Sequence, residues 1–155
     1  NIDINDICEV VKNFSGVEHR LEFVRNLNGV EYYNDSKSTN NKSTQIALSA
    51  FNKPTIILLG GLDRGQLFDE LLPFMKNVRS IICYGQTKEK IAEFALKNKI
   101  NCTVVNNLKE ATTLAYNTAE NGDVVLLSPA CASWDQYKKF EDRGDEFKKI
   151  VSELK

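Results

Sequence analysis

The sequence has few of the side chains from which metal and redox sites are built. It holds a single histidine, His19, and four cysteines that lie far apart, with no pair at the Cys-x-x-Cys spacing. Structural zinc sites take their ligands from clustered cysteine and histidine side chains. These absences argue against a zinc site, and they predict free thiols of the kind found in reduced, cytoplasmic proteins.

Membrane and nucleic-acid functions are also disfavoured. No apolar run approaches the ~18 residues that span a bilayer, and no signal peptide is visible. The formal net charge is −1, so the chain has no excess of positive charge for binding a phosphate backbone. With 155 residues, 42% of them hydrophobic, the chain is expected to fold as one domain around its own core.

Common phosphate-binding and nucleophile motifs are missing as well. The Gly-x-x-x-x-Gly-Lys-[Ser/Thr] and Gly-x-Gly-x-x-Gly patterns are absent, so the chain has neither a P-loop nor a dinucleotide fingerprint. Gly-x-Ser-x-Gly is absent too, and His19 lies far along the chain from Ser133 and Cys131, so neither is expected to be a nucleophile. If the protein uses ATP, another domain must hold the phosphates.

The order of apolar patterns predicts an α/β fold, a Rossmann-like, mostly parallel sheet flanked by helices. Strands alternate with helical segments of about 10–15 residues, which is typical of βαβ units. Strands are predicted at 54–59, 80–84, 101–105 and 124–127, and helices at 4–14, 41–51, 67–75, 88–97, 108–118 and 140–154. Two alternating runs joined by Asn28-Gly29 predict an N-terminal β-hairpin that adds an antiparallel edge.

The run Val124–Phe140 is the centre of the predicted site. An apolar strand passes through Ser-Pro and small residues into a helix expected to begin near Trp134-Asp135. A helix N-terminus after a tight turn presents free N–H groups and suits an anion. Ser133 is then a donor to an oxyanion; the alternative is that Ser133 only caps the helix while Trp134, Tyr137 and Phe140 pack.

The stretch at 34–40 concentrates hydroxyls, a carboxylate and a lysine. Lys37 suits a phosphate or carboxylate, Thr39 a carboxylate oxygen, and Asp35 a ribose hydroxyl or a metal-bound water. The alternative is an elaborate helix cap, because Ser, Thr, Asp and Asn are preferred at helix starts.

The stretch Gly60–Gly65 combines glycines with a cation. The glycines allow a close approach of backbone to a ligand, and Arg64 offers a bidentate fork for a carboxylate. The alternative is an ordinary loop with a surface ion pair. All three polar stretches follow predicted strands, and the carboxyl ends of parallel strands share one edge of a sheet, so we expect them to form one site.

Four motifs in this order resemble the C-terminal domain of the Mur ligases, and the resemblance covers nearly the whole chain. They are Val-Glu-His-Arg-Leu-Glu at 17–22, Asn-Asp-Ser-Lys-Ser-Thr-Asn at 34–40, Leu-Leu-Gly-Gly with Asp-Arg-Gly at 58–65, and Leu-Ser-Pro-Ala-Cys-Ala-Ser-Trp-Asp-Gln at 127–136. Together with Phe-Glu-x-Arg-Gly at 140–144, the last motif is similar to the D-glutamate-adding members. The resemblance implies that residues 1–16 are the tail of, or link from, a central ATPase domain, and that 17–155 form the amino-acid-binding domain.

The same resemblance implies an ATP-dependent, amide-forming ligase of peptidoglycan precursor synthesis, cytoplasmic and monomeric. ATP would phosphorylate the carboxylate of UDP-N-acetylmuramoyl-L-alanine, and the amine of D-glutamate would attack the acyl phosphate, giving an amide, ADP and phosphate. ATP and Mg²⁺ would be held mainly by the central domain, with no metal bound by this chain. The chain alone is therefore expected to be inactive.

Roles for individual D-glutamate contacts are also implied by the resemblance. Thr39 and Arg64 would hold the α-carboxylate, although some members have lysine where Arg64 stands, so the contact geometry differs. Ser133, with the backbone around Trp134 and Phe140, would hold the side-chain carboxylate.

Three more residues receive roles in the same way. Lys37 would be the catalytic cation, facing the phosphoryl end or a substrate carboxylate. Arg20 and Asp35 would meet the nucleotide when the domains close. Two alternatives remain: the domain of another Mur-type or folylpolyglutamate-type ligase, and a non-catalytic anion- or nucleotide-binding module.

Overall fold

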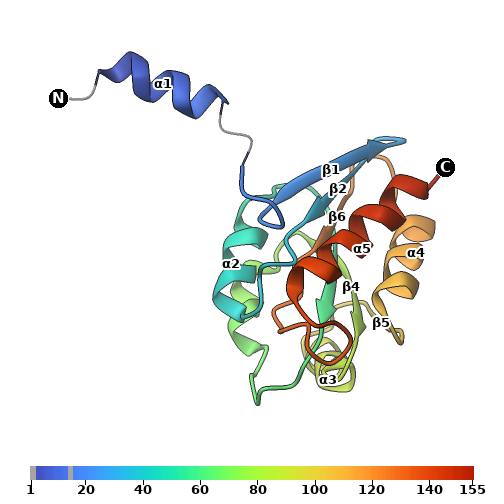
Figure 1. Ribbon diagram of the computed structural model, residues 1–155. Helices are drawn as coiled ribbons and strands as arrows, with labels where there is room; N and C mark the ends of the chain where they lie inside the picture. The colour runs from blue at the N-terminus through green and yellow to red at the C-terminus, as the bar shows by residue number, and fades with distance from the viewer. Residues whose placement is uncertain (1–2, 14–15) are drawn as a thin grey trace.

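The computed structural model of the protein describes residues 3–13 and 16–155. In these residues six strands form one sheet in the order β1-β2-β6-β3-β4-β5 (Figure 1). Their bounds are β1 (Glu22–Leu27), β2 (Val30–Asn34), β3 (Thr55–Gly60), β4 (Val78–Tyr84), β5 (Cys102–Val104) and β6 (Val124–Leu127). The mostly parallel sheet is confirmed, and its antiparallel edge is β1 alone, since β2 pairs in parallel with β6.

The hairpin between β1 and β2 forms where the sequence predicts it. Asn28 and Gly29 both have positive φ, 54° and 82°, as a two-residue hairpin turn requires. The Gly29 amide donates to Oδ1 of Asn26 at 3.1 Å, which closes the turn. The Asn-Gly pair therefore sets the register of the edge.

Helices cover both faces of the sheet. The first face carries α2 (Asn41–Ser49), the 3₁₀ helix η1 (Asp69–Phe74) and α3 (Lys88–Lys97); the second carries α4 (Leu108–Thr118) and α5 (Phe140–Glu153). The central strands are buried on both sides: in β3, Ile57 and Leu59 face the first layer while Ile56 and Leu58 face the second. Continuous apolar runs in the sequence reflect this two-sided burial.

The N-terminal helix α1 (Ile4–Asn13) lies apart from the sheet in Figure 1. The predicted helix at 4–14 is confirmed as far as Asn13, and Phe14 lies outside the described residues.

No helix in the described part of the chain is long and apolar enough to cross a membrane.

The three polar stretches start at one edge of the sheet. Strands β2, β6 and β3 are neighbours that run in parallel, so their carboxyl ends, Asn34, Leu127 and Gly60, lie side by side. This confirms that the stretches 34–40, 60–65 and 128–134 share one edge.

The helix predicted to begin near Trp134 is wrong. Residues 134–136 form an isolated turn, in which the amides of Gln136 and Tyr137 donate to the Ser133 carbonyl at 3.0 and 2.8 Å. The helix α5 begins only at Phe140. Trp134, Tyr137 and Phe140 have a helical spacing, but Trp134 is 61% exposed and does not face the core.

Candidate functional site

The loop after β2 ends in a helix cap and begins in a buried network. Asn40 caps α2, its side chain accepting from the Ser43 amide at 3.0 Å. The predicted capping role therefore holds for Asn40. Lys37 is exposed and Thr39 is partly exposed, so both remain available to a ligand.

Asp35 faces the interior of the protein. Its carboxylate accepts from the Leu21 amide at 3.2 Å, from the Ser128 hydroxyl at 2.7 Å and from the Ser38 hydroxyl. Burial raises the pKa of Asp35, and these hydrogen bonds oppose that rise. The side chain is fully buried here and links the loops after β2 and β6, so its contact with a nucleotide stays a prediction.

Arg143 is the main residue of this edge that the sequence analysis left without a role. Its side chain is fully buried, and it donates to Oγ of Ser36 at 2.9 Å, to the Ser36 carbonyl at 2.8 Å and to the Cys131 carbonyl at 3.0 Å. The signal in the sequence was the Phe-Glu-x-Arg-Gly motif, which contains it. Arg143 joins α5 to the loops after β2 and β6.

The glycines at the end of β3 make room for neighbouring protein backbone. Gly60 and Gly61 have φ of 135° and 146°, and a Cβ on them would collide with the carbonyls of Tyr84 and Ala132, respectively. The Gly60 amide donates to the Pro129 carbonyl at 3.0 Å, which ties the loops after β3 and β6 together. The expectation that the backbone here also lets a ligand approach stays a prediction.

Arg64 and Trp134 meet across the site. The guanidinium Cζ lies 4.6 Å from the centroid of the indole ring, and both side chains are exposed. Arg64 also borders a cleft of about 540 Å³ between the loops after β2 and β3. The cleft is lined by Thr39, Asn40, Asn41, Lys42, Arg64, Gln66, Leu67, Glu70 and Ala130. The structure thus brings Thr39 and Arg64 to one cleft, with Trp134 against Arg64.

Lys37 and Phe140 form a second pair. The Lys37 ammonium lies 5.9 Å from the centroid of the Phe140 ring, within cation–π range. Phe140 is the first residue of α5, and its carbonyl accepts from the Ser36 hydroxyl at 2.7 Å. The loop after β2 is therefore attached to the start of α5.

Ser133 carries an unpaired hydroxyl. The residue is 1% exposed, and in the described part of the chain its Oγ has no hydrogen-bond partner. Buried polar atoms are nearly always paired, so an orphan of this kind calls for an explanation. A ligand oxygen that accepts from Ser133 would supply one.

Cys131 has the character of a framework residue. Its thiol is buried, Nε2 of Gln66 lies 2.9 Å from Sγ, and burial raises the pKa of the thiol. The thiolate is the nucleophilic form, so a raised pKa makes Cys131 a poor nucleophile at neutral pH. This agrees with the expectation that it does no covalent chemistry.

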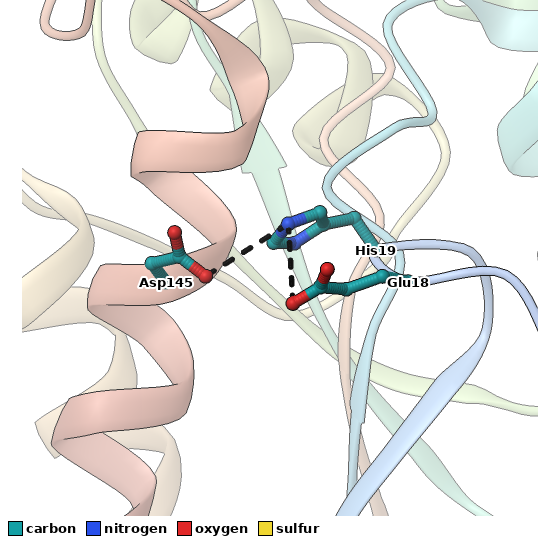
Figure 2. Close-up of side chains that lie close together, drawn as sticks. All are labelled: Glu18, His19 and Asp145. Atoms are coloured by element: carbon teal, nitrogen blue, oxygen red, sulfur yellow. Dashed lines mark ion pairs between the residues drawn. The ribbon is translucent and has the colours of Figure 1, made fainter.

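His19 lies between the carboxylates of Glu18 and Asp145 (Figure 2). Its Nδ1 is 2.9 Å from Nδ2 of Asn34, and its Nε2 is 3.9 Å from Glu18 and 3.8 Å from Asp145. The ammonium of Lys148 contacts the same two carboxylates, at 2.6 and 3.3 Å. These contacts attach α5 to the segment before β1.

Arg20 is placed next to the loop after β2. Its Nη1 donates to the Ser38 hydroxyl at 3.4 Å, and Ser38 in turn donates to Asp35. The two residues expected to meet a nucleotide are thus joined through one serine. The structure positions them together, and the nucleotide contact itself stays a prediction.

Residues 19–131 match the family described as Mur ligase, glutamate ligase domain. The chain is 52% identical over 155 residues to the UDP-N-acetylmuramoylalanine--D-glutamate ligase of Lactobacillus helveticus, covering 99% of this chain and 34% of that protein. It is 52% identical over 149 residues to the enzyme of the same name from Bacillus cereus strain AH187, covering 96% of this chain and 33% of that protein. The chain therefore spans about a third of the length of these relatives.

Solved structures share the fold at low sequence identity. The UDP-N-acetylmuramate-alanine ligase MurC from Thermotoga maritima superposes with a TM-score of 0.67 at 14% identity, over 99% of this chain and 34% of that one. The MurF ligase from Thermotoga maritima in complex with ADP gives a TM-score of 0.61 at 19% identity, over 98% of this chain and 34% of that one. These likenesses confirm the predicted α/β architecture.

Proposed function

The chain belongs to the Mur ligase family, in its glutamate ligase domain, and from this premise we propose that it binds D-glutamate for an ATP-dependent ligase. The substrate that receives D-glutamate is UDP-N-acetylmuramoyl-L-alanine, and the product belongs to peptidoglycan precursor synthesis. This follows the names of the relatives that are 52% identical to nearly the whole chain. ATP and the UDP-linked substrate are bound mainly by parts of the ligase outside this chain.

One observation carries the proposal: the cations Arg64 and Lys37 and the unpaired hydroxyl of Ser133 all belong to loops at one edge of the sheet. D-Glutamate has two carboxylates, so its site needs donors and positive charge in two places. Arg64 borders the cleft with Thr39, and Ser133 directly precedes Trp134, the ring on which Arg64 lies. Thr39 and Arg64 are proposed to hold the α-carboxylate.

The other end of the amino acid is assigned to the loop after β6. Ser133 donates its free hydroxyl to the side-chain carboxylate, and backbone around Trp134 and Phe140 completes the contact. Phe140 opens α5, whose N-terminal amides favour negative charge. Lys37, over the Phe140 ring, faces a substrate carboxylate or the transferred phosphoryl group.

The chemistry that these residues serve is acyl activation followed by amine attack. The γ-phosphoryl of ATP moves to the carboxylate of the UDP-linked substrate and leaves ADP. The D-glutamate amine then attacks the acyl carbon, a proton leaves the nitrogen, and phosphate departs as the amide forms. The domain contributes position and positive charge, and Arg20 and Asp35 are proposed to meet the nucleotide on closure.

Magnesium fits poorly at this edge of the sheet. Mg²⁺ prefers carboxylate and water oxygens, whereas the cleft is lined by two cations, Arg64 and Lys42, and by a single carboxylate residue, Glu70. The carboxylate of Asp35 is already occupied by three hydrogen bonds. The ion would be held outside this chain.

The full-length ligase that contains this chain provides the test. ADP release is measured with UDP-N-acetylmuramoyl-L-alanine and ATP, adding D-glutamate, L-glutamate or other D-amino acids in turn. We expect D-glutamate to support turnover, and Ser133→Ala and Arg64→Ala to raise its KM more than that of ATP. Turnover that ignores D-glutamate, or D-glutamate kinetics unaffected by both substitutions, would overturn the proposal.

The alternatives give different results in the same assay. Another ligase of the wider family would release ADP with a different amino acid. A non-catalytic anion-binding module would release none, although NMR titration of this chain with ADP would still shift resonances. NMR shifts at Ser133 and Arg64 with millimolar D-glutamate support a preformed amino-acid site.

A further inference from the structure

Arg143 is a buried cation without a buried counter-charge in contact with it. Its relative exposure is 0%. Within residues 3–13 and 16–155, no carboxylate oxygen lies within the 4.0 Å ion-pair distance of its guanidinium nitrogens. Its hydrogen-bond acceptors are a hydroxyl and two backbone carbonyls, all neutral. A buried charge is costly unless it is paired or well solvated by hydrogen bonds, so the burial of this arginine calls for an explanation.

Its contacts join three segments that are each proposed to hold substrate. The Ser36 carbonyl and hydroxyl accept from Nη2 and Nε, and Ser36 directly precedes Lys37. The Cys131 carbonyl accepts from Nη1, two residues before Ser133. The Ser36 hydroxyl donates onward to the Phe140 carbonyl at 2.7 Å. Arg143 thus reaches the immediate neighbours of Lys37 and Ser133, and Phe140 through one serine.

A second observation at the same edge points to an anion. The Ser133 hydroxyl is buried and lacks a partner, two residues from a carbonyl that Arg143 fixes. A carboxylate that accepted from Ser133 would satisfy the orphan donor, and it would bind to a loop whose Cys131 carbonyl is held by a buried positive charge. The ligand would then supply the hydrogen-bond acceptor that the Ser133 hydroxyl lacks within the described fold.

We propose that Arg143 is a positioning residue for D-glutamate, one that fixes Ser133 and Phe140 around the side-chain carboxylate and places positive charge behind them. The inference rests on the proposed function and deepens it. Arg143 does not touch the substrate in this assignment; it acts through the two loops that it holds.

The geometry requires arginine rather than any cation. Three nitrogens of one planar group donate in separate directions, to two different loops. A lysine ammonium is a compact charge on a flexible stem and cannot reproduce this fork. Arg143→Lys therefore keeps the charge and removes the positioning.

Arg25, on strand β1, offers a matched control because it anchors the same helix, α5. It also donates to backbone carbonyls, those of Val151, Ser152 and Leu154 at 3.1, 3.3 and 3.0 Å, but at the opposite end of α5. Arg25→Lys removes a comparable set of bonds far from the carboxyl edge of the sheet. It reports what loss of an α5 anchor does to the fold alone.

The experiment compares the two variants in the full-length ligase. Melting temperature and KM are measured for D-glutamate, ATP and UDP-N-acetylmuramoyl-L-alanine. We expect Arg143→Lys to raise the KM for D-glutamate by about 10- to 100-fold, the range for lost charge-assisted contacts and misplaced binding groups. The KM for ATP should change little, and Arg25→Lys should lower the melting temperature without a selective effect on D-glutamate.

Two further measurements protect the test against misfolding. Ser36→Ala leaves the two carbonyl contacts of Arg143 in place but removes the hydroxyl that accepts from Nε and donates to Phe140, and we expect a smaller rise in the same KM. Millimolar guanidinium added to Arg143→Ala should lower its KM for D-glutamate, and it should do nothing for Arg25→Ala.

Several outcomes would overturn the inference. They are a D-glutamate KM unchanged in Arg143→Lys or Ser36→Ala, an equal rise for all three substrates, and an effect that Arg25→Lys reproduces. Failure of the proposed function has a different signature, because the wild-type ligase would then show no dependence on D-glutamate at all.

Discussion

The guanidinium of Arg64 lies over the indole of Trp134, with Cζ 4.6 Å from the ring centroid. The contact joins the loop after β3 to the loop after β6, and it places the exposed indole beside the cleft that Arg64 lines. A long cation stacked on an aromatic face loses part of its rotamer freedom before any ligand arrives. If Arg64 holds the α-carboxylate as proposed, the stack orients its guanidinium before D-glutamate binds.

Removing the indole should weaken substrate binding without unfolding the protein. A cation–π contact at an exposed site is worth about 0.5–1 kcal/mol, so Trp134→Ala in the full-length ligase should raise the KM for D-glutamate roughly two- to fivefold. Because Trp134 is 61% exposed, the melting temperature of the Trp134→Ala variant should hardly differ from that of the wild type. Trp134→Phe keeps an aromatic face and serves as the control. A KM in Trp134→Ala equal to wild type would show that the stack does not orient Arg64.

The Ser133 hydroxyl should matter for binding and not for stability. It is buried without a partner, so Ser133→Ala removes an unsatisfied donor and should leave the free energy of unfolding unchanged or raise it by about 1 kcal/mol. The KM for D-glutamate should rise in the same variant. Chemical denaturation and steady-state kinetics check the two halves separately. A variant that lost stability would reveal a hydrogen bond that the wild type makes within the fold.

Much of the fold could be predicted because the local sequence patterns match the strands, the turn and the helices that the structure contains. The four apolar runs, the Asn28-Gly29 turn and the alternation with helices suffice to predict a parallel sheet with an antiparallel edge. The common edge of the polar stretches then follows from the direction of parallel strands. These inferences need only periodicity and turn chemistry.

Sequence patterns failed where the position of a side chain depends on a contact with a residue far away in the sequence. Trp134 has the helical spacing relative to Tyr137 and Phe140, yet it lies on Arg64, a residue far away in the sequence. Arg143 sits in a highly charged helical pattern where an arginine is normally on the surface, and only Ser36 and Cys131 explain its burial. No periodicity encodes such contacts. The motif that contains Arg143 was the available signal.

Two glycines in the loop after β3 should respond differently to alanine. Gly61 has φ of 146°, and an added Cβ would collide with the Ala132 carbonyl and lie 2.9 Å from Cβ of Cys131. Gly65 also has positive φ, 79°, but nothing lies within 4 Å of its added Cβ. Gly65→Ala should cost only the backbone strain of about 1–2 kcal/mol, and Gly61→Ala more, because the loop after β6 must move.

Urea denaturation of the two variants measures the difference. Gly65→Ala is the matched control, since it carries the same substitution and a positive φ without the collision. Because the moved loop carries Ser133, Gly61→Ala in the full-length ligase should also raise the KM for D-glutamate, and Gly65→Ala should raise it less. Equal losses of stability in both variants would mean that the loop after β6 moves away from the added Cβ without a cost in free energy.

The buried carboxylate of Asp35 predicts a definite sign of pH dependence. Burial raises the pKa of Asp35 above its ordinary value, against the opposing hydrogen bonds from Ser38, Ser128 and the Leu21 amide. Between the unfolded pKa of about 3.9 and the raised folded pKa, the native state therefore binds more protons than the unfolded state. The contribution of Asp35 to the free energy of unfolding is largest below that window and falls as the pH rises through it.

Asp35→Asn isolates this effect, because asparagine has nearly the same shape and does not titrate. The difference in unfolding free energy, wild type minus Asp35→Asn, should fall as the pH rises from about 4 and become constant above the folded pKa. Urea denaturation at a series of pH values measures the difference, and a carbon-13 NMR titration of the Asp35 carboxyl locates the folded pKa directly. A difference that rose with pH would place the folded pKa below the unfolded one and make Asp35 a favourably paired carboxylate. The sign thus decides whether ionisation of Asp35 opposes or favours the native fold.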